Sequence, residues 1–346
     1  MQHKNKGKKM KMLKFLAVVT VISFSGLTLA IAKSTTHRVP EDFATIQLAV
    51  DSGFVSDGDQ IRVGPGDWCG ATITKELDLL GEDGATIIGC ASSPALGPFR
   101  IGFLLPDDES ASGSTFRHFV FDGAGVSNQA PGNFDPLSFA IFSRGADDVT
   151  IEQNHVIGTV QSFTNTNGSG WTVNHNTIED LTVFTCDGLV TCGGGDGIVF
   201  QDRNAGGPRQ TDNIAMFNVI SGAVPDNLEL FSMAGIIILG AEDGTVLQKN
   251  RIEIPENPSA IAEGHAIRVS DVCCGGAAGF QTVINSVIVK NDGRNSEFSL
   301  VIDKDSTGGT GNTEGTTIRG NFGINEINEV TSDVANRSIM TLIEFP

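Results

Sequence analysis

The chain has 346 residues, with 23 Lys and Arg against 41 Asp and Glu, so its formal net charge is −18 at pH 7. A surface of this sign repels phosphate, which argues against nucleic acid as a partner and favours cations and neutral or cationic polymers, although solubility alone also explains the charge. Gly is abundant at 42 residues and Tyr is absent, a composition that suits many short strands and turns instead of long helices.

Residues 1–32 are typical of a secretory signal peptide. Six lysines precede an apolar run from Phe15 to Leu29, and Ala30-Ile31-Ala32 offers a small-x-small cleavage site. A membrane anchor is the alternative, but the run is short for a full span. We expect a secreted, periplasmic or cell-surface protein, with no membrane contact after signal cleavage. Loss of the six lysines leaves 17 basic against 41 acidic residues, a net charge of −24 for the mature chain.

Two motifs open the mature chain. The first, VPEDFATIQLAV (39–50), predicts a short helix near 44–51, because Ile46, Ala49 and Val50 fall on one helical face. The second, GDQIRVGPG (58–66), follows closely. Together they resemble the start of the pectin-lyase-like β-helix superfamily, which includes pectin methylesterases and copper-accessory periplasmic β-helix proteins. In that superfamily the first motif forms a helix over the open end of the coil, and the second forms the first coil.

The resemblance implies an all-β fold, a right-handed single-stranded parallel β-helix with a short N-terminal capping helix. A cap is needed because a stack of coils otherwise ends in unpaired strand edges. One fold of this kind hosts many activities, so the resemblance says more about architecture than about function.

Six cysteines in an exported chain are compatible with disulfides. Cys69 and Cys90 lie about one repeat apart, and we expect them to be bonded. Cys186 and Cys192 flank a short loop, whereas the adjacent pair Cys273-Cys274 forms a strained bridge or stays free. A metal site is the weaker alternative, because the chain has no Cys-x-x-Cys pair and its His residues are scattered.

A repeat runs through residues 149–324. Each copy holds an apolar-x-apolar strand, a short polar step, an Asn and a second apolar pair. The Asn series is Asn154, Asn176, Asn218, Asn250, Asn285 and Asn321. A further apolar strand lies upstream of most of them, at Ala140–Ser143, Gly197–Gln201, Gly235–Leu239, Ala266–Ser270 and Ser299–Asp303. Three short strands and one corner per coil predict a parallel β-helix, formed as a single domain by residues 33–346.

The Asn at each corner is interpreted as structural. Asn tolerates left-handed backbone angles better than most residues. Stacked Asn side chains can also hydrogen-bond along the axis of the coil, as amide ladders do.

The upstream strands supply the candidate site. Alternation predicts that their second and fourth residues point inward and that the third and fifth face solvent. The residue just past the strand is then Asp202, Gly240, Asp271 and Lys304 in successive coils. Coils about 4.8 Å apart place Asp202 and Asp271 on the order of 9–10 Å from each other, which fits the two carboxylates of an inverting glycoside hydrolase. Gly240 between them would leave a notch.

Further candidates lie on the same strands. Asp196 and His265, two coils apart and at the strand start, form a second candidate catalytic pair. Arg268 faces the same side and could hold a substrate carboxylate. Gln201 and Asp303 share that side and complete the candidate substrate-binding set.

A structural interpretation competes with this site. Asp, Gly and Asn populate every β-helix turn because the turns demand them. Val199, Ile237, Leu239 and Val301 also make the face apolar, so that it could carry a binding partner or a covering loop. Gly264-His265-Ala266 loosely resembles the Gly-His-Gly element of polygalacturonases, and Gln201-Asp202 resembles the Gln-Asp of pectin methylesterases. The accompanying elements of both enzyme families are missing.

Calcium is the one cofactor that the sequence suggests. The acidic loops Asp107-Asp108-Glu109 and Asp147-Asp148 could take calcium, although solvated turn charges are commoner.

Three functions remain open. The first is a monomeric exported protein that engages polysaccharide and cleaves it as a hydrolase or lyase. The second is a non-catalytic surface or periplasmic module that binds carbohydrate or protein. The third, an accessory factor for metal delivery, rests on the resemblance alone, and the six His and absence of a Met-rich tract weigh against it.

Overall fold

The computed structural model describes residues 34–96, 99–123, 137–182, 184–186, 190–193, 195–202, 209–223, 233–240, 242–256, 264–270, 283–303, 315–323 and 325–326. The leader 1–32 lies outside them. Residues 34–346 form one compact unit. No helix in the described part is both long and apolar enough to span a membrane.

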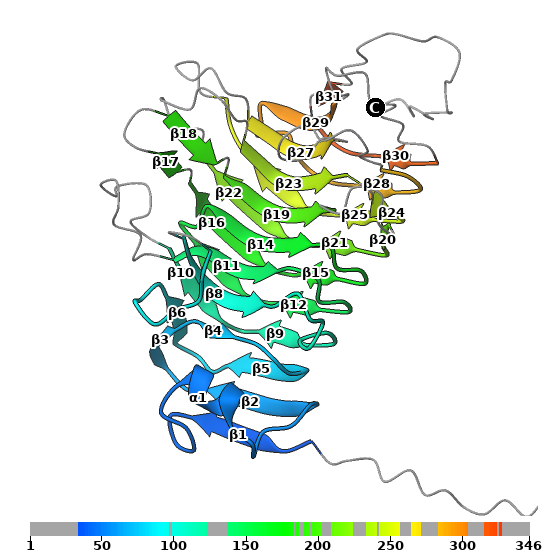
Figure 1. Ribbon diagram of the computed structural model, residues 1–346. Helices are drawn as coiled ribbons and strands as arrows, with labels where there is room; N and C mark the ends of the chain where they lie inside the picture. The colour runs from blue at the N-terminus through cyan, green and yellow to red at the C-terminus, as the bar shows by residue number, and fades with distance from the viewer. Residues whose placement is uncertain are drawn as a thin grey trace, which may run out of the picture. The chain divides into compact units, whose positions relative to one another are not determined.

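Three parallel sheets make up this part of the chain (Figure 1). Sheet A stacks β1 (Thr36–Val39), β2 (Asp59–Val63), β5 (Leu77–Gly81), β9 (Thr115–Arg117), β12 (Thr150–Glu152), β15 (Thr172–Asn174), β21 (Ile214–Met216), β25 (Val246–Gln248), β28 (Val287–Val289) and β30 (Thr317–Arg319). Sheet B stacks β3 (Gly66–Cys69), β6 (Ala85–Ile88), β10 (Val120–Asp122), β13 (His155–Ile157), β16 (Thr177–Leu181), β22 (Val219–Gly222) and β26 (Arg251–Glu253).

Sheet C stacks β4 (Ala71–Thr72), β8 (Phe99–Leu105), β11 (Leu137–Ser143), β14 (Gln161–Thr166), β19 (Asp196–Gln201), β23 (Met233–Leu239), β27 (Gly264–Ser270), β29 (Phe298–Asp303) and β31 (Asn325–Glu326). The short β7 (Ala95–Leu96) runs antiparallel to β8. Two small sheets pair β17 (Phe184–Cys186) with β18 (Val190–Gly193), and β20 (Gln210–Thr211) with β24 (Glu242–Asp243).

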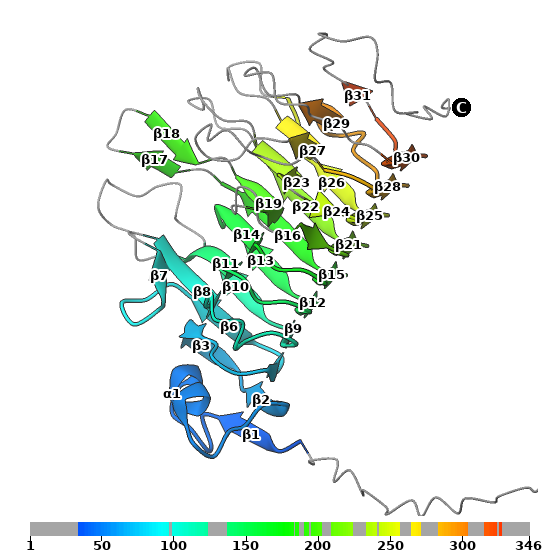
Figure 2. The same ribbon diagram turned by 45° about the vertical axis from the view of Figure 1, so that its right-hand side comes forward.

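The chain visits sheets A, B and C in turn and rises by one coil each time, which makes a right-handed parallel β-helix (Figure 2). The fold class expected from the sequence is therefore confirmed. Among the described residues there is one helix, the six-residue α1 (Ile46–Asp51), and the side chain of Thr45 before it accepts a hydrogen bond from the Leu48 amide at 3.1 Å. Ile46, Ala49 and Val50 of α1 are buried, and the helix contacts strands of the first coils.

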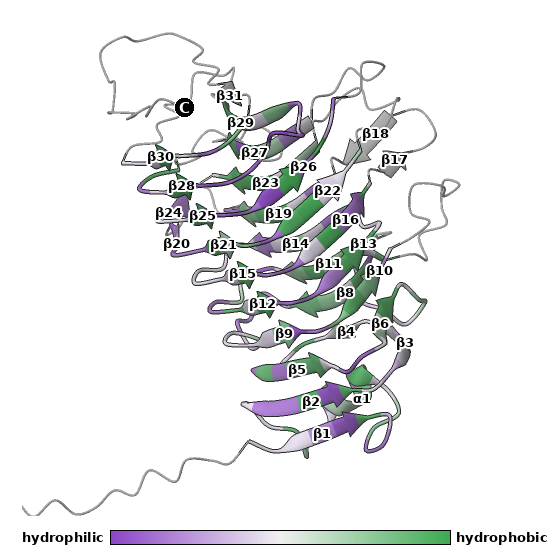
Figure 3. Ribbon diagram, turned by 180° about the vertical axis from the view of Figure 1, so that it is seen from behind, coloured by the Kyte–Doolittle hydropathy of each residue, from purple (hydrophilic) through white to green (hydrophobic). Residues whose placement is uncertain are grey.

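The inside of the coil is a continuous apolar column. On sheet A the middle residue of each short strand points inward and stacks on its counterpart in the next coil, as Ile151 does on Val173. Polar neighbours of these residues point outward, so the strands alternate between green and purple when seen from behind (Figure 3). An inward side chain with a coil above and below it is excluded from water on all sides, whereas Ile318 of β30 is only partly buried.

A ladder of buried Asn side chains joins the coils at the corner between sheets A and B. Each Asn accepts, through Oδ1, bonds from the backbone N–H and the side-chain amide of the Asn one coil earlier, at 2.9–3.1 Å. The members are Asn154, Asn176, Asn218, Asn250, Asn291 and Asn321. In the coil before Asn154, the corresponding position is occupied by Phe119, whose backbone N–H donates to Asn154 Oδ1.

Asn285 does not belong to this ladder, so its assignment from the sequence is wrong. It lies at the corner between sheets C and A, has φ of 51°, and donates to Asp243 at 2.9 Å. The strand of this coil is β28, and Asn291 follows it. Asn285 lies at a different corner because the coil turns twice within a few residues, and both turns accept Asn.

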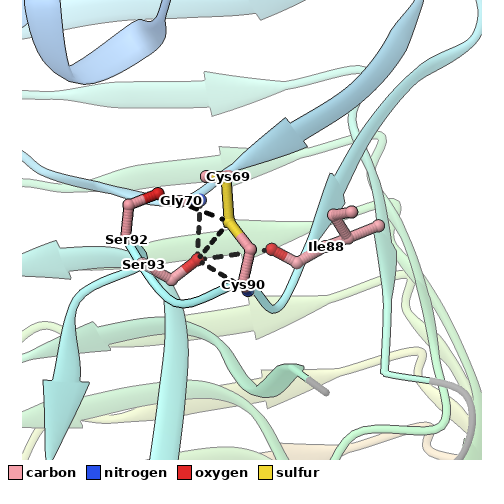
Figure 4. Close-up of a disulfide and its surroundings, with 6 residues drawn as sticks. All are labelled: Cys69, Gly70, Ile88, Cys90, Ser92 and Ser93. Atoms are coloured by element: carbon pink, nitrogen blue, oxygen red, sulfur yellow. Dashed lines mark hydrogen bonds between the residues drawn. A yellow bond between two sulfur atoms is a disulfide. The ribbon is translucent and has the colours of Figure 1, made fainter. Parts of the chain in front are cut away.

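The disulfide between Cys69 and Cys90 is present, as expected from their spacing (Figure 4). Cys69 ends β3 and Cys90 follows β6, the neighbouring strand of sheet B, so the two Cα atoms are 5.7 Å apart. Ser93 Oγ accepts hydrogen bonds from the amides of Gly70 and Cys90 at 3.1 and 3.2 Å and fixes the loop around the bridge. The cysteine pair 273-274 lies outside the described residues, and nothing is described of the side chains of Cys186 and Cys192.

Candidate functional site

The outward face of sheet C carries the residues that the sequence singled out. Strand register aligns them in columns that run along the axis. The first column holds Gln161, Asp196, Ala234 and His265 in successive coils. The next holds Thr164, Val199, Ile237, Arg268 and Val301. Asp196 and His265 therefore stand two coils apart, at a backbone separation of about 9–10 Å.

The alternation expected along these strands is correct, but the expected exposure is wrong. Ile198, Phe200, Ile236, Ile238, Ile267, Val269, Leu300 and Ile302 lie in the inner core. Val199, Ile237 and Leu239 lie on the opposite face, where they form a separate apolar cluster with Ala234. Val199 is 1% and Ile237 6% exposed, so these two residues are buried and do not contact solvent as predicted, whereas Asp196, Leu239 and Arg268 on the same face are partly exposed. Strand periodicity defines which side a residue faces and not what covers that side.

Asp196 has an unusual environment. Its carboxylate accepts a hydrogen bond from Gln161 Nε2 at 3.2 Å, and Gln161 in turn accepts from Thr164 Oγ1 at 2.9 Å. Burial raises the pKa of Asp196 to about 7, although the positive charge of Arg268 and the Gln161 bond act in the opposite direction. A carboxyl group with this pKa is half protonated near neutral pH and can donate a proton.

His265 and Arg268 lie on β27, two coils beyond Asp196. His265 is 2% exposed, and its ring meets Phe298 edge-on with centroids 5.7 Å apart. Arg268 is half-buried, and its charge reaches Asp196. The structure thus brings an acid, a base and a cation to one face of sheet C.

Asp202 sits at the other end of β19 and is buried at 3% exposed. Its amide donates to the Leu239 carbonyl at 3.0 Å, which places it beside Gly240 of the next coil. Gly240 has φ of +83°, and a Cβ there would meet the Asp202 carbonyl at 3.0 Å. Gly240 therefore serves a tight turn, and the notch expected there from its missing side chain is closed by the Asp202 backbone.

The remaining predicted residues are placed only in part. Asp271 lies outside the described residues, so the Asp202–Asp271 separation stays a prediction. Asp303 ends β29 in register with Ser270, but nothing is described of its side chain. Gln201 is buried and donates to Thr166 Oγ1 at 2.7 Å, one coil earlier.

Sequence reasoning missed Glu242, which lies near Asp202. Glu242 is completely buried, and its Oε2 accepts hydrogen bonds from Asn213 Nδ2 and Thr245 Oγ1, both at 2.9 Å. Burial raises its pKa to about 7, and the negative charge of Asp202 adds to that shift. Gln161 was missed as well; its signal was the column position one coil before Asp196.

Metal ligands are sparse in what the structure describes, where no group of three or more His, Cys, Asp or Glu could hold an ion. Asp108 accepts bonds from the amide and hydroxyl of Ser110 at 3.1 and 2.6 Å. Asp147 accepts from the Ser169 amide at 2.7 Å. One carboxylate of each acidic loop is therefore bonded within the protein, that of Asp108 inside its own turn and that of Asp147 to the next coil.

No protein-family model matches the sequence, and no curated protein matches it. Among solved structures the chain is similar to the catalytic domain of a GH87 α-1,3-glucanase in complex with tetrasaccharides, at 14% identity over 83% of this chain and 58% of that one, with a TM-score of 0.44. A second such glucanase domain is covered over 66% of its length. The chain thus spans about three fifths of the glucanase domains that it matches.

Two further structures are similar over most of their length. A pectin methylesterase in complex with a hexasaccharide is 14% identical over 89% of this chain and 93% of that one, with a TM-score of 0.39. The A-module of the Azotobacter vinelandii mannuronan C-5 epimerase AlgE4 is 15% identical over 82% and 91%, with a TM-score of 0.33. At these identities the likeness concerns the fold alone.

Proposed function

We propose that this β-helix of pectin-lyase-like architecture is an exported protein that engages acidic polysaccharide on the outward face of sheet C and cleaves it by elimination. The observation that carries the proposal is the column that aligns Asp196 with His265 two coils away, with Arg268 on the same strand as His265. Burial raises the pKa of Asp196 to about 7, and the charge of Arg268 acts on this carboxyl. Strongly shifted carboxyls of this kind gather at functional sites.

The residues divide the reaction among them. Arg268 pairs with the carboxylate of a uronic acid unit and stabilises charge that develops next to it. His265 takes the C5 proton as general base, the C4–O4 bond breaks as the C4–C5 double bond forms, and protonated Asp196 gives its proton to the leaving O4. No oxidant, reductant or water is consumed.

Hydrolysis by Asp196 together with Asp202 has no geometric support. Asp196 begins β19 and Asp202 directly follows it, so the two residues are about 20 Å apart along the strand, whereas an inverting pair needs about 6.5–9.5 Å. The pair Asp202–Asp271 remains the hydrolytic alternative and is tested by the same assay.

The second candidate function is a non-catalytic module that binds carbohydrate or protein. The burial of part of the sheet C face favours it, since His265 and Val199 are only 2% and 1% exposed.

The test screens the purified protein on polygalacturonate, alginate and neutral glucans with two readouts, ultraviolet absorbance of the unsaturated product for elimination and release of reducing ends for cleavage of either kind. We expect Asp196→Asn and His265→Gln to lose about 100-fold or more in turnover. Asp122→Asn, a half-buried outward residue of sheet B, is the matched control and should keep full activity.

Full activity in both site variants would remove elimination at this site. Loss of activity in Asp202→Asn and Asp271→Asn, without effect of Asp196→Asn, would identify the hydrolytic pair instead. Binding to the polymers without turnover on any of them would establish the non-catalytic module.

A further inference from the structure

The corner between sheets A and B presents one exposed side chain per coil. These residues directly precede the ladder Asn, or Phe119 in its place, and all have left-handed backbone angles with φ between 54° and 62°. We call them the corner ridge: His118, Gln153, His175, Phe217, Lys249 and Lys290. Because the residue that follows each of them is buried, the ridge side chains stand out from the coil at regular steps of about 4.8 Å.

The middle of the ridge is a stacked platform. The rings of His175 and Phe217 lie parallel within 16°, with centroids 4.9 Å apart. Lys249, one coil further along, places its Nζ over the Phe217 ring at 4.9 Å from the centre. Phe217 is 38% exposed, and a bulky side chain with φ of 56° is strained. An exposed, strained aromatic residue contributes little to the core, which points to a role in binding.

The upper end of the ridge is basic. Lys249 and Lys290 make no salt bridge with any described residue, and Arg251, Arg294 and Arg319 lie on the flanking strands and turn. Against these five cations stand Glu253 and Asp292, which pair with Arg251 and Arg294. The local charge is therefore positive, in a chain whose net charge is −18.

A second aromatic contact and a hollow continue the surface. Arg294 lies over the ring of Phe322 at 5.6 Å, and Phe322 is 45% exposed. The hollow, of about 360 Å³, is lined by Arg251, Glu253, Asp292, Arg294 and Asn295 with Ile252 at its base. Aromatic faces bordered by Arg, Asn and carboxylates suit a sugar ring and its hydroxyl and carboxylate groups.

We propose that the corner ridge and this hollow bind an acidic polysaccharide, a polymer of uronic acids, laid along the axis of the coil. Lys249, Lys290 and Arg319 attract its carboxylates, and a sugar ring packs against the exposed edges of the His175–Phe217 stack. Charge complementarity favours this ligand, because the acidic remainder of the surface repels a polyanion and this basic corner attracts it. The surface is separate from the sheet C face and goes beyond the proposed function, since it needs no catalysis.

The test measures binding to immobilised polygalacturonate and alginate at low salt, with dextran as the neutral polymer. We expect the wild type to prefer both uronates to dextran and to lose affinity as salt rises. Lys249→Gln/Lys290→Gln should bind the uronates about tenfold more weakly or worse. Arg38→Gln/Arg144→Gln removes the same charge from exposed sites outside the ridge and should stay within about twofold of wild type.

Phe217→Asn separates binding from folding. Asn tolerates the left-handed backbone, so the melting temperature should be unchanged or higher while uronate affinity falls about fivefold. Equal weakening in the ridge and control variants overturns the proposal, as does equal binding of dextran or tighter binding of single-stranded DNA. A dimer that the lysine variant dissociates would assign the ridge to a second copy of the chain instead. Asp196→Asn should keep this binding, so failure of the catalytic proposal is distinguishable.

Discussion

At the scale of single residues, the ladder Asn side chains connect the coils most directly. Asn218 is completely buried, donates to the Val173 carbonyl and to Asn250 Oδ1, and accepts from the amide and side chain of Asn176. Its removal leaves buried donors and an acceptor without partners, and each such group costs about 1–3 kcal/mol.

We predict that Asn218→Ala lowers the free energy of unfolding by about 3 kcal/mol or more. Asn285→Gly is the matched control, because Asn285 is exposed and glycines occupy the same corner in the neighbouring coils, at Gly244 and Gly315. It should change the free energy of unfolding by less than about 1 kcal/mol. Chemical denaturation of the three proteins decides, and equal losses would contradict the ladder.

Glu242 makes stability depend on pH. Its pKa rises from 4.5 to about 7 on folding, so between these values the folded state binds more protons than the unfolded state. The stabilising effect is complete below about pH 4.5 and is lost as the pH rises through 7.

We predict that the free energy of unfolding falls between pH 5 and pH 8 and that Glu242→Gln removes on the order of 3 kcal/mol of this fall. Asp196 acts with the same sign, so some slope remains in the variant. Glu76→Gln, at an exposed site, should leave the slope unchanged. Denaturant titrations at both pH values measure the effect; identical slopes in wild type and Glu242→Gln would contradict it.

At the scale of elements, the disulfide closes two neighbouring strands of sheet B. Cys69 and Cys90 are 21 residues apart in the sequence, and a cross-link over a loop of this length restricts the unfolded chain by about 3 kcal/mol.

We predict that Cys69→Ser/Cys90→Ser lowers the free energy of unfolding by about 2–4 kcal/mol and leaves the circular dichroism spectrum that of a β protein. Peptide mapping without reductant should recover the 69–90 cross-link from the wild type. Free thiols at both positions of the exported protein would show that the bond does not form.

The elements also show what a sequence can reveal. The strands predicted upstream of the Asn residues agree with the structure: Gly197–Gln201 corresponds to β19 and Ser299–Asp303 to β29. They could be predicted because each strand is a local run of apolar residues between turns. Asn285 and Asn291 both follow an apolar triplet, and only the non-local bond to Asn321 decides which of them joins the ladder. Choosing between them requires the register of the next coil.

In the candidate site, too, the features set by strand register could be predicted from the sequence, and those set by non-local packing could not. The shared column of Asp196 and His265 followed from aligning the strands, since register in a stack of coils is a property of the sequence repeat. The burial of Asp202 and Val199 and the partners of Glu242 depend on what packs over a face. Glu242 lies two residues after the turn residue Gly240, where an acidic residue is normally solvated, so nothing in its local sequence marked it.

At the scale of the whole molecule, the net charge of −18 acts against compactness. Like charges repel one another across the surface, and 0.1 M salt largely screens the repulsion between charges more than about 10 Å apart. Added salt should therefore stabilise the folded chain.

We predict that the melting temperature rises with NaCl and levels off once repulsion is screened. CaCl₂ at equal ionic strength should give the same curve if the acidic loops 107–109 and 147–148 only make bonds within the protein, as Asp108 and Asp147 do. A further rise at micromolar to millimolar calcium, reversed by a chelator, would reveal a calcium site. A melting temperature that falls with NaCl would contradict the repulsion.

The Asn ladder has a consequence for how this fold varies. Successive ladder members are separated by as few as 22 residues, from Asn154 to Asn176, and by as many as 42, from Asn176 to Asn218. Yet the bond from the backbone amide of one Asn to the side chain of the next is 2.9–3.0 Å long at every step. The spacing of the ladder is therefore set by the number of coils and does not depend on how many residues each coil contains. A residue inserted into a loop between two sheets therefore does not shift the register of the later strands. The loops on the surface can change in length and sequence while the stack of coils is kept.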